Sequence, residues 1–260
     1  MFSIKTHFIK IVSIIILLLS LLSSSLFAEI DFNLIMPFGY NFTFSDAKIT
    51  ESYISLISLK NTDYYEVGVQ SQIGYNFDTK NSIFKSISIM AEIGYQLSPM
   101  SVSYNNSYSE VTNNILFHTL HIGLIQKFYV LDRLSFGIGG GIRIPFSADV
   151  KVYGDDLRYP PIPTNNGKYD YSYIKSLFNS RVIPYIKLTM DGYYFFNDFV
   201  SLIIGLYITY SMDMNFNTDK LNSAFRTAYY HNYSYSSIGA GINIGLSIGR
   251  KGSNERKIIE

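Results

Sequence analysis

Hydrophobic and polar residues alternate along most of the chain. In the segment 134–146, "LSFGIGGGIRIPF", apolar side chains from Leu134 to Phe146 share one parity with Gly140 as the only gap, while the other glycines, Ser135 and Arg143 occupy the other parity. A period of two is typical of a β-strand with one apolar face. Glycine-rich segments also cradle phosphates, but no helical spacing follows this one. We therefore interpret the segment as a strand and not as a nucleotide-binding loop.

The same alternation predicts eight strands. They cover residues 32–44, 65–77, 86–96, 116–128, 134–146, 182–194, 200–212 and 238–248. A tilted strand of about ten residues crosses a bilayer, and eight strands make the smallest barrels of bacterial outer membranes. The pattern predicts an all-β fold, an eight-stranded antiparallel up-and-down transmembrane β-barrel.

The connections alternate in length. "DTKNSI", "LDR" and "ND" join the second strand to the third, the fourth to the fifth, and the sixth to the seventh. The other connections are long and polar, covering approximately residues 45–64, 98–114, 147–180 and 213–237. In outer-membrane barrels short turns face the periplasm and long loops face outward, which predicts the orientation of this chain.

Residue type predicts which face lines the lumen. Most glycines and most charged strand residues lie on the less apolar face, whereas rings gather near the ends of the apolar face. A lysine or arginine facing lipid at mid-bilayer costs about 2 to 4 kcal/mol, and aromatic girdles mark both membrane interfaces. We therefore expect the apolar face to contact lipid. The expected inward charges are Glu66, Glu92, Lys127, Arg143, Arg181, Lys187 and Asp191.

The N-terminus predicts export. Lys5 and Lys10 precede an apolar run at 11–22, and serines then lead to Ala28. This is the layout of a cleaved signal peptide, and the apolar run is short for the alternative, an uncleaved anchor. The expected parts are a signal peptide at 1–28, an outer-membrane barrel at 29–250 and a polar periplasmic tail at 251–260.

Composition excludes several classes of function. The formal net charge is only +1, which gives no reason to expect a nucleic-acid partner. Cysteine is absent, so the chain has neither disulfides nor thiolate metal sites.

In this pattern of eight strands with alternating connections, residues 30–250 resemble the small outer-membrane proteins that include the OmpA and OmpX transmembrane domains and the opacity-type surface proteins. The resemblance implies a bacterial outer-membrane location, with membrane lipid and the insertion machinery as partners. It also implies a role as surface antigen, adhesin or structural anchor, since only a few members modify lipids. One departure is the last strand, which ends on Ile248 and not on an aromatic residue.

The positions of the histidines in the sequence do not indicate a catalytic or metal-binding site. His118 is expected on the lipid face near the outer rim, but no serine partner lies in its strand, and we interpret it as a rim residue. His121 is expected in the lumen as a hydrogen-bonded residue, and metal-ligand spacing is lacking. We predict no catalytic, metal or cofactor site and no enzymatic activity; a lipid-modifying barrel enzyme remains the less favoured alternative.

An eight-stranded barrel is just wide enough for its own side chains to fill. The expected lumen charge network comprises Glu66, Glu92, Lys127, Arg143, Lys187 and Asp191. Within it we expect Glu92 to pair with Arg143, and Asp191 to accept from Lys187 or Lys127, because isolated buried charges are costly. A small channel is therefore the alternative and not the first choice.

The long connections are rich in tyrosine, as in "KYDYSY" within 147–180 and "AYYHNYSYSS" before 238. Tyrosine with serine and asparagine makes adaptable contact surfaces. We therefore expect a surface protein with a structural, adhesive or antigenic role, carried by extracellular loops that contact a host or other extracellular ligand.

Overall fold

The computed structural model describes residues 30–49, 58–61, 63–79, 83–105, 110–131, 133–153, 166–180, 182–197, 199–219 and 230–249. The predicted signal peptide and periplasmic tail lie outside these residues.

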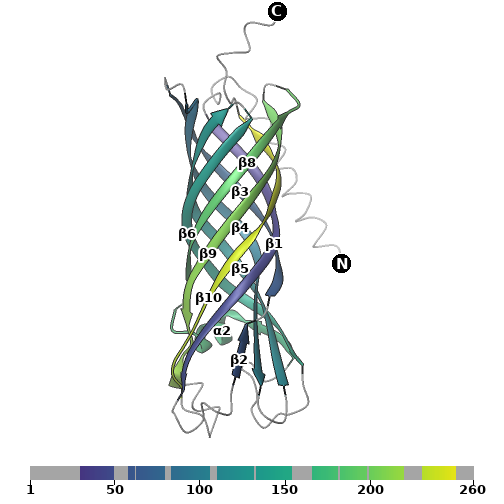
Figure 1. Cartoon of the computed structure of the whole chain (residues 1–260), viewed down its shortest axis with the longest axis vertical. Coiled ribbons are helices and arrows are strands. Elements are labelled where there is room, and N and C mark those ends of the chain that lie inside the picture. The colour runs from purple at the N-terminus through teal and green to yellow at the C-terminus, as the bar shows by residue number, and fades with distance from the viewer. Residues whose placement is uncertain are drawn as a thin grey trace, which may run out of the picture.

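Eight long strands close into a ring (Figure 1). They are β1 (Ile30–Ile49), β3 (Asp63–Asp78), β4 (Ser86–Asn105), β5 (Glu110–Leu131), β6 (Leu134–Tyr153), β8 (Ile183–Phe195), β9 (Val200–Asn215) and β10 (Tyr230–Ile248). Each pairs antiparallel with its neighbour in this order, and pairing of β1 with β10 closes the ring. The predicted eight-stranded up-and-down barrel is confirmed.

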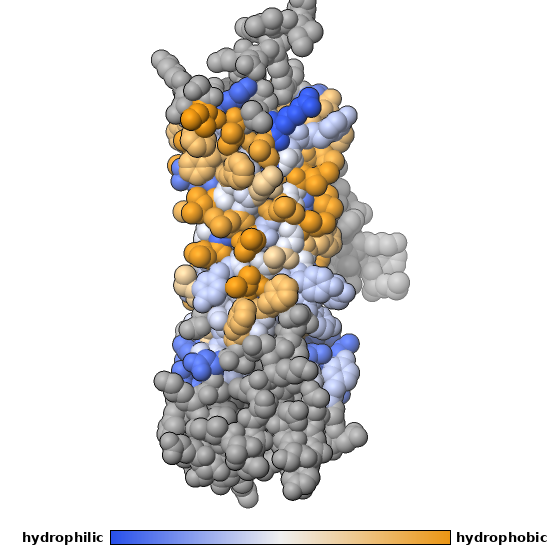
Figure 2. Space-filling model, viewed as in Figure 1, coloured by the Kyte–Doolittle hydropathy of each residue, from blue (hydrophilic) through white to orange (hydrophobic). Residues whose placement is uncertain are grey.

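The two faces of the wall divide as the alternation predicts. Outward side chains are widely exposed; Ile73, Leu124 and Ile204, for example, are 52%, 63% and 59% exposed. Figure 2 shows apolar residues spread over the upper and middle parts of the wall, above a more polar lower part. Water would disfavour so large an apolar surface, whereas lipid covers it without cost. The barrel therefore spans a membrane, and a closed barrel with this surface is a protein of the bacterial outer membrane.

Strands continue beyond the predicted span at one end. β4 has 20 residues and β5 has 22, whereas the alternation ended near Gln96 and began again near Leu116. At about 3.4 Å per residue, the nine added residues of β4 extend its strand by about 30 Å. At the end of the barrel that carries the long connections, the wall therefore extends well beyond the lipid.

Shorter elements complete this outer end. β2 (Ser58–Asn61) pairs with β4, and β7 (Gly167–Asp170) pairs with β6. They lie with helix α2 (Tyr171–Leu177) toward the lower end of Figure 1. The sequence predicted only irregular connections here, so these elements are additions to the prediction. No helix in the described part of the chain is long and apolar enough to cross a membrane.

Asp170 starts helix α2. Its carboxylate accepts hydrogen bonds from the Tyr173 amide, at 3.0 Å, and from the Ser172 hydroxyl, at 2.8 Å. These bonds favour the ionised carboxylate and lower the pKa of Asp170. A seven-residue helix is marginal by itself, so the cap and the burial of Ile174 and Leu177 hold it in place.

Candidate functional site

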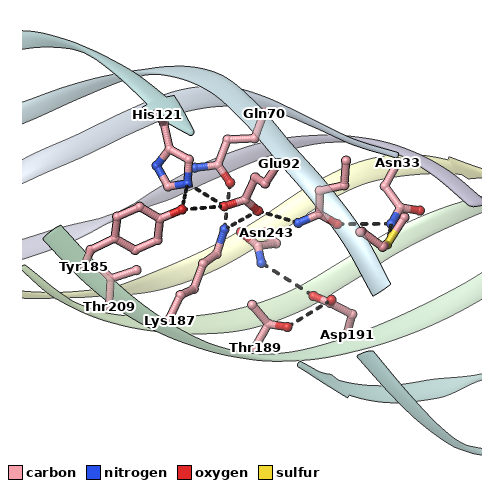
Figure 3. A network of polar contacts seen from close by, with 12 residues as sticks. Asn33, Gln70, Glu92, His121, Tyr185, Lys187, Thr189, Asp191, Thr209 and Asn243 are labelled. Atoms are coloured by element: carbon pink, nitrogen blue, oxygen red, sulfur yellow. Dashed lines mark hydrogen bonds and ion pairs between the residues drawn. The ribbon is translucent and has the colours of Figure 1, made fainter. Parts of the chain in front are cut away.

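The centre of the lumen is organised around Glu92 of β4 (Figure 3). Its Oε1 contacts His121 Nε2 and accepts from Tyr185 Oη at 3.2 Å. Its Oε2 accepts from Lys187 Nζ at 2.9 Å and from Gln72 Nε2 at 2.6 Å. Because every one of these groups is directed inward, the polar face of the wall forms a connected network and not a row of separate charges.

Amides extend this network sideways. Gln70 Oε1 accepts from Lys187 Nζ at 2.7 Å, and Asn33 Nδ2 donates to Gln72 Oε1 at 3.1 Å. These partners bring β1, β3, β4 and β8 into a single set of hydrogen bonds across the lumen. Hydrogen bonds that link side chains of several strands in this way hold the side chains in fixed positions, although His121 Nδ1 has no hydrogen-bond partner among the described residues.

A second ion pair lies nearer the end with the short turns. Lys127 Nζ of β5 donates to Asp191 Oδ2 of β8 at 2.9 Å, and both side chains are 0% exposed. Thr189 and Asn243 contact the same carboxylate at 3.4 and 3.5 Å. Of the two donors expected for Asp191, Lys127 is the one that forms the ion pair, whereas Lys187 forms an ion pair with Glu92.

A third group of polar side chains lies nearer the outer end of the lumen. Its contacts differ from the pairing that we expected. Arg143 is directed at the hydroxyls of Ser211 and Thr209, at 3.1 and 3.5 Å, and not at Glu92. Glu66 accepts from Tyr207 Oη at 2.6 Å. Within the described ranges, Arg143 has no carboxylate in ion-pair distance. Arg181, also expected to point inward, lies outside the described residues.

Arg143 and Glu92 miss each other because the strands are tilted. His121 and Arg143 are directly opposed in the β5–β6 register, and His121 takes the Glu92 oxygen that Arg143 was expected to contact. The guanidinium instead lies over the Tyr185 ring, 5.4 Å from its centroid. Barrel stagger determines which side chains share a height, and strand order alone does not contain it.

Glycines provide the space that this crowded interior needs. A side-chain carbon at Gly123 would collide with Tyr185 Oη, and one at Gly239 would lie 2.7 Å from both Glu66 Oε1 and Thr209 Oγ1. The glycine-rich face of the wall is therefore the inward one, and the space that its glycines leave allows long polar side chains to cross the lumen. Side chains fill the barrel at these levels.

An apolar cluster occupies the outer mouth. It contains Met100, Ile115, Phe117, Ala148, Val150, Ile174, Leu177, Phe178, Ile183, Met214, Phe216, Tyr233 and Tyr235. Phe178 packs on Phe216 with ring centroids 4.5 Å apart, and Phe216 stacks on Tyr233 at 4.3 Å. Helix α2 contributes Ile174 and Leu177, so a small hydrophobic core lies in the mouth.

The outer wall carries one polar constellation that sequence reasoning missed. His118 of β5 lies between Tyr95 of β4 and Asp149 of β6. Tyr95 Oη is 2.5 Å from His118 Nδ1, and His118 Nε2 is 3.2 Å from Asp149 Oδ2. The strand of His118 contains neither partner, because Tyr95 and Asp149 belong to the adjacent strands. In the described ranges, no group of three or more potential ligands could hold a metal ion.

No protein-family model matches the sequence, and comparison with the curated proteins finds no relative. Solved structures with a similar fold include the outer membrane protease OmpT of Escherichia coli, with 10% identity, a TM-score of 0.40, and coverage of 85% of this chain and 96% of that chain. The outer membrane protein OprG of Pseudomonas aeruginosa has 9% identity and a TM-score of 0.38, with coverage of 86% and 97%. The attachment invasion locus protein Ail of Yersinia pestis has 9% identity and a TM-score of 0.34, with coverage of 83% and 99%. These likenesses concern the fold alone.

Proposed function

We propose that this outer-membrane barrel is a non-catalytic surface protein with a structural or adhesive role. In this role the barrel is a rigid base, and the contact surface lies on the strands and connections above the lipid. The observation that carries the proposal is the outer end of the wall, where β4, β5 and β6 continue beyond the apolar surface around a hydrophobic core of their own.

That core supports a rigid platform. Phe117 and Val150 come from long strands, Ile174 comes from α2, and all three are at most 4% exposed. Burying apolar side chains contributes roughly 1.5 to 3 kcal/mol each, which favours a fixed arrangement over a loose set of loops. A fixed platform loses less conformational entropy when it binds a partner.

Exposed tyrosines make this platform suitable for contacts. Tyr153, at the end of β6, is 54% exposed, and Tyr171 at the start of α2 is 42% exposed. Tyr169 and Tyr173 stack with ring centroids 4.4 Å apart. Tyrosine supplies a large contact area at a low entropy cost, as it does in antibody combining sites.

The interior supports this proposal over the channel alternative. The Lys127–Asp191 pair, the Glu92 network and the apolar cluster at the mouth follow one another along the lumen. An ion would have to displace paired charges and then cross an apolar layer.

The adhesion test compares bacteria that display the wild type with bacteria that carry an empty vector, using attachment to epithelial monolayers. We expect several-fold higher attachment for the wild type, and loss of most of it when Tyr153 and Tyr171 are both replaced by serine. Tyr194→Ser is the matched control, because Tyr194 is 64% exposed at the opposite rim. Equal attachment of wild-type and empty-vector cells would contradict an adhesive role.

A separate measurement addresses the channel alternative. The purified protein is reconstituted in a planar lipid bilayer, and we expect no unitary conductance steps. Stable, reproducible steps would show an open path and would replace the proposed role with that of a channel.

A further inference from the structure

The Tyr95–His118–Asp149 constellation lies on the outer wall, where the apolar surface meets the extracellular end. Phe146 packs beside it, with ring centroids 6.1 Å from Tyr95 and 6.2 Å from His118. Aromatic side chains of this kind mark the level of lipid head groups. The side chains of His118 and Asp149 are 25% and 35% exposed, so both reach the surface.

A groove of about 150 Å³ adjoins the constellation and includes Asp149 in its lining. Pro99, Leu116 and Asp149 form one row across β4, β5 and β6. Pro99 and Leu116 give the groove an apolar floor, which lies on the outer side of His118 along β5. The groove therefore adjoins the polar constellation at the outer edge of the head-group level.

Cationic and polar donors surround the other side. Lys151 lines the groove together with Asn114, its direct partner in the β5–β6 register. Lys168 of β7 is directly opposed to Asp149 of β6, so the two side chains lie on the same face of the sheet. Both lysines are exposed. Asp149, the carboxylate among them, is already engaged by His118.

We propose that this groove binds the phosphate group of an outer-leaflet lipid, with Lys151 and Lys168 beside the phosphate. Two observations select a lipid as the occupant. The rings of Tyr95 and Phe146 beside the groove lie at the level of lipid head groups, and both lysines lie on the outward face at the outer end of the wall. Charge-assisted hydrogen bonds from lysine to phosphate are stronger than neutral ones.

The test uses native mass spectrometry of the purified protein in a maltoside detergent, which carries no phosphate. The probes are diphosphoryl lipid A and the same lipid with its phosphates removed. We expect the diphosphoryl form to bind at least about tenfold more tightly, and Lys151→Ala combined with Lys168→Ala to remove about tenfold of its affinity.

Lys175→Ala is the matched control, because Lys175 is an exposed lysine on α2, away from the groove. It should leave affinity unchanged, and unheated gel mobility verifies that every variant is folded. Equal affinity for the two lipids, or unchanged affinity in the double lysine variant, would overturn the proposal. Displacement of the lipid by an equal concentration of inorganic phosphate would also overturn it, because the site would then bind free phosphate and not lipid.

Discussion

Replacing Lys127 by methionine tests the buried ion pair. Lys127 Nζ and Asp191 Oδ2 are 2.9 Å apart, and both side chains are fully buried. At an effective dielectric constant of about 20, their attraction amounts to about 6 kcal/mol, most of which offsets the desolvation of the two charges. Lys127→Met removes the attraction and leaves the desolvated carboxylate with only the 3.4 and 3.5 Å contacts of Thr189 and Asn243.

We therefore expect Lys127→Met to destabilise the barrel by about 3 to 5 kcal/mol. Asp191→Asn in the same chain removes the stranded charge without changing shape, so the double variant should recover at least about 2 kcal/mol of that loss. The assay is urea unfolding in lipid vesicles, with folded and unfolded forms separated by unheated gel electrophoresis. Additive effects of the two substitutions would refute the reasoning, because residues that do not interact show no coupling.

Three further predictions follow from the lumen and the outer end. Arg143→Met and Glu92→Leu should show a coupling below about 1 kcal/mol in the same unfolding assay, because the two residues share Tyr185 as a partner but form no ion pair; a larger coupling would show a direct contact. Gly123→Ala should destabilise the barrel by about 1 to 3 kcal/mol, because the added carbon collides with Tyr185 Oη. Tyr185→Phe in the same chain should relieve part of that cost, and no relief would mean that the backbone makes the clash. Asp170, whose pKa is lowered by the cap of α2, stabilises that helix at neutral pH; this contribution should disappear as the pH falls through the lowered pKa. Amide exchange of α2 should therefore rise in acid in the wild type and be independent of that titration in Asp170→Asn, and equal pH dependence of the two proteins would contradict the assignment.

The orientation of the wall could be predicted from side-chain parity. Successive side chains of a strand point to opposite faces, so the alternation around Arg143 and Glu92 sorted residues into two sets before any strand was paired. Charge and glycine content then distinguished lumen from lipid. This sorting is local, and later strand pairing changes which residues meet but not which face they occupy.

Partners across the lumen could not be predicted in the same way. Glu92 is opposite Gly123 in the β4–β5 register, yet its side chain contacts Lys187 of β8. Which strands bring their side chains to one height depends on the tilt and stagger of the closed barrel. These quantities depend on all the strand pairings together. The predicted Glu92–Arg143 pair is therefore wrong, and Lys127 is one of the two donors that we predicted for Asp191.

The structure of the outer end could not be predicted from the sequence for another reason. Its strands are stabilised by pairing with one another and by a core in which Phe117, Phe178 and Phe216 come from three separate segments. The two-residue period within any one of these segments is therefore weak. Likewise, Tyr95, His118 and Asp149 lie on three strands and share no spacing along the chain. The sequence by itself determined the class of fold, the eight strands of the ring and the faces of the residues in their alternating segments, because these follow from local alternation. Only the tertiary structure decided the ion pairs, the apolar core at the mouth and the outer-wall constellation, because each depends on contacts between residues distant in the chain.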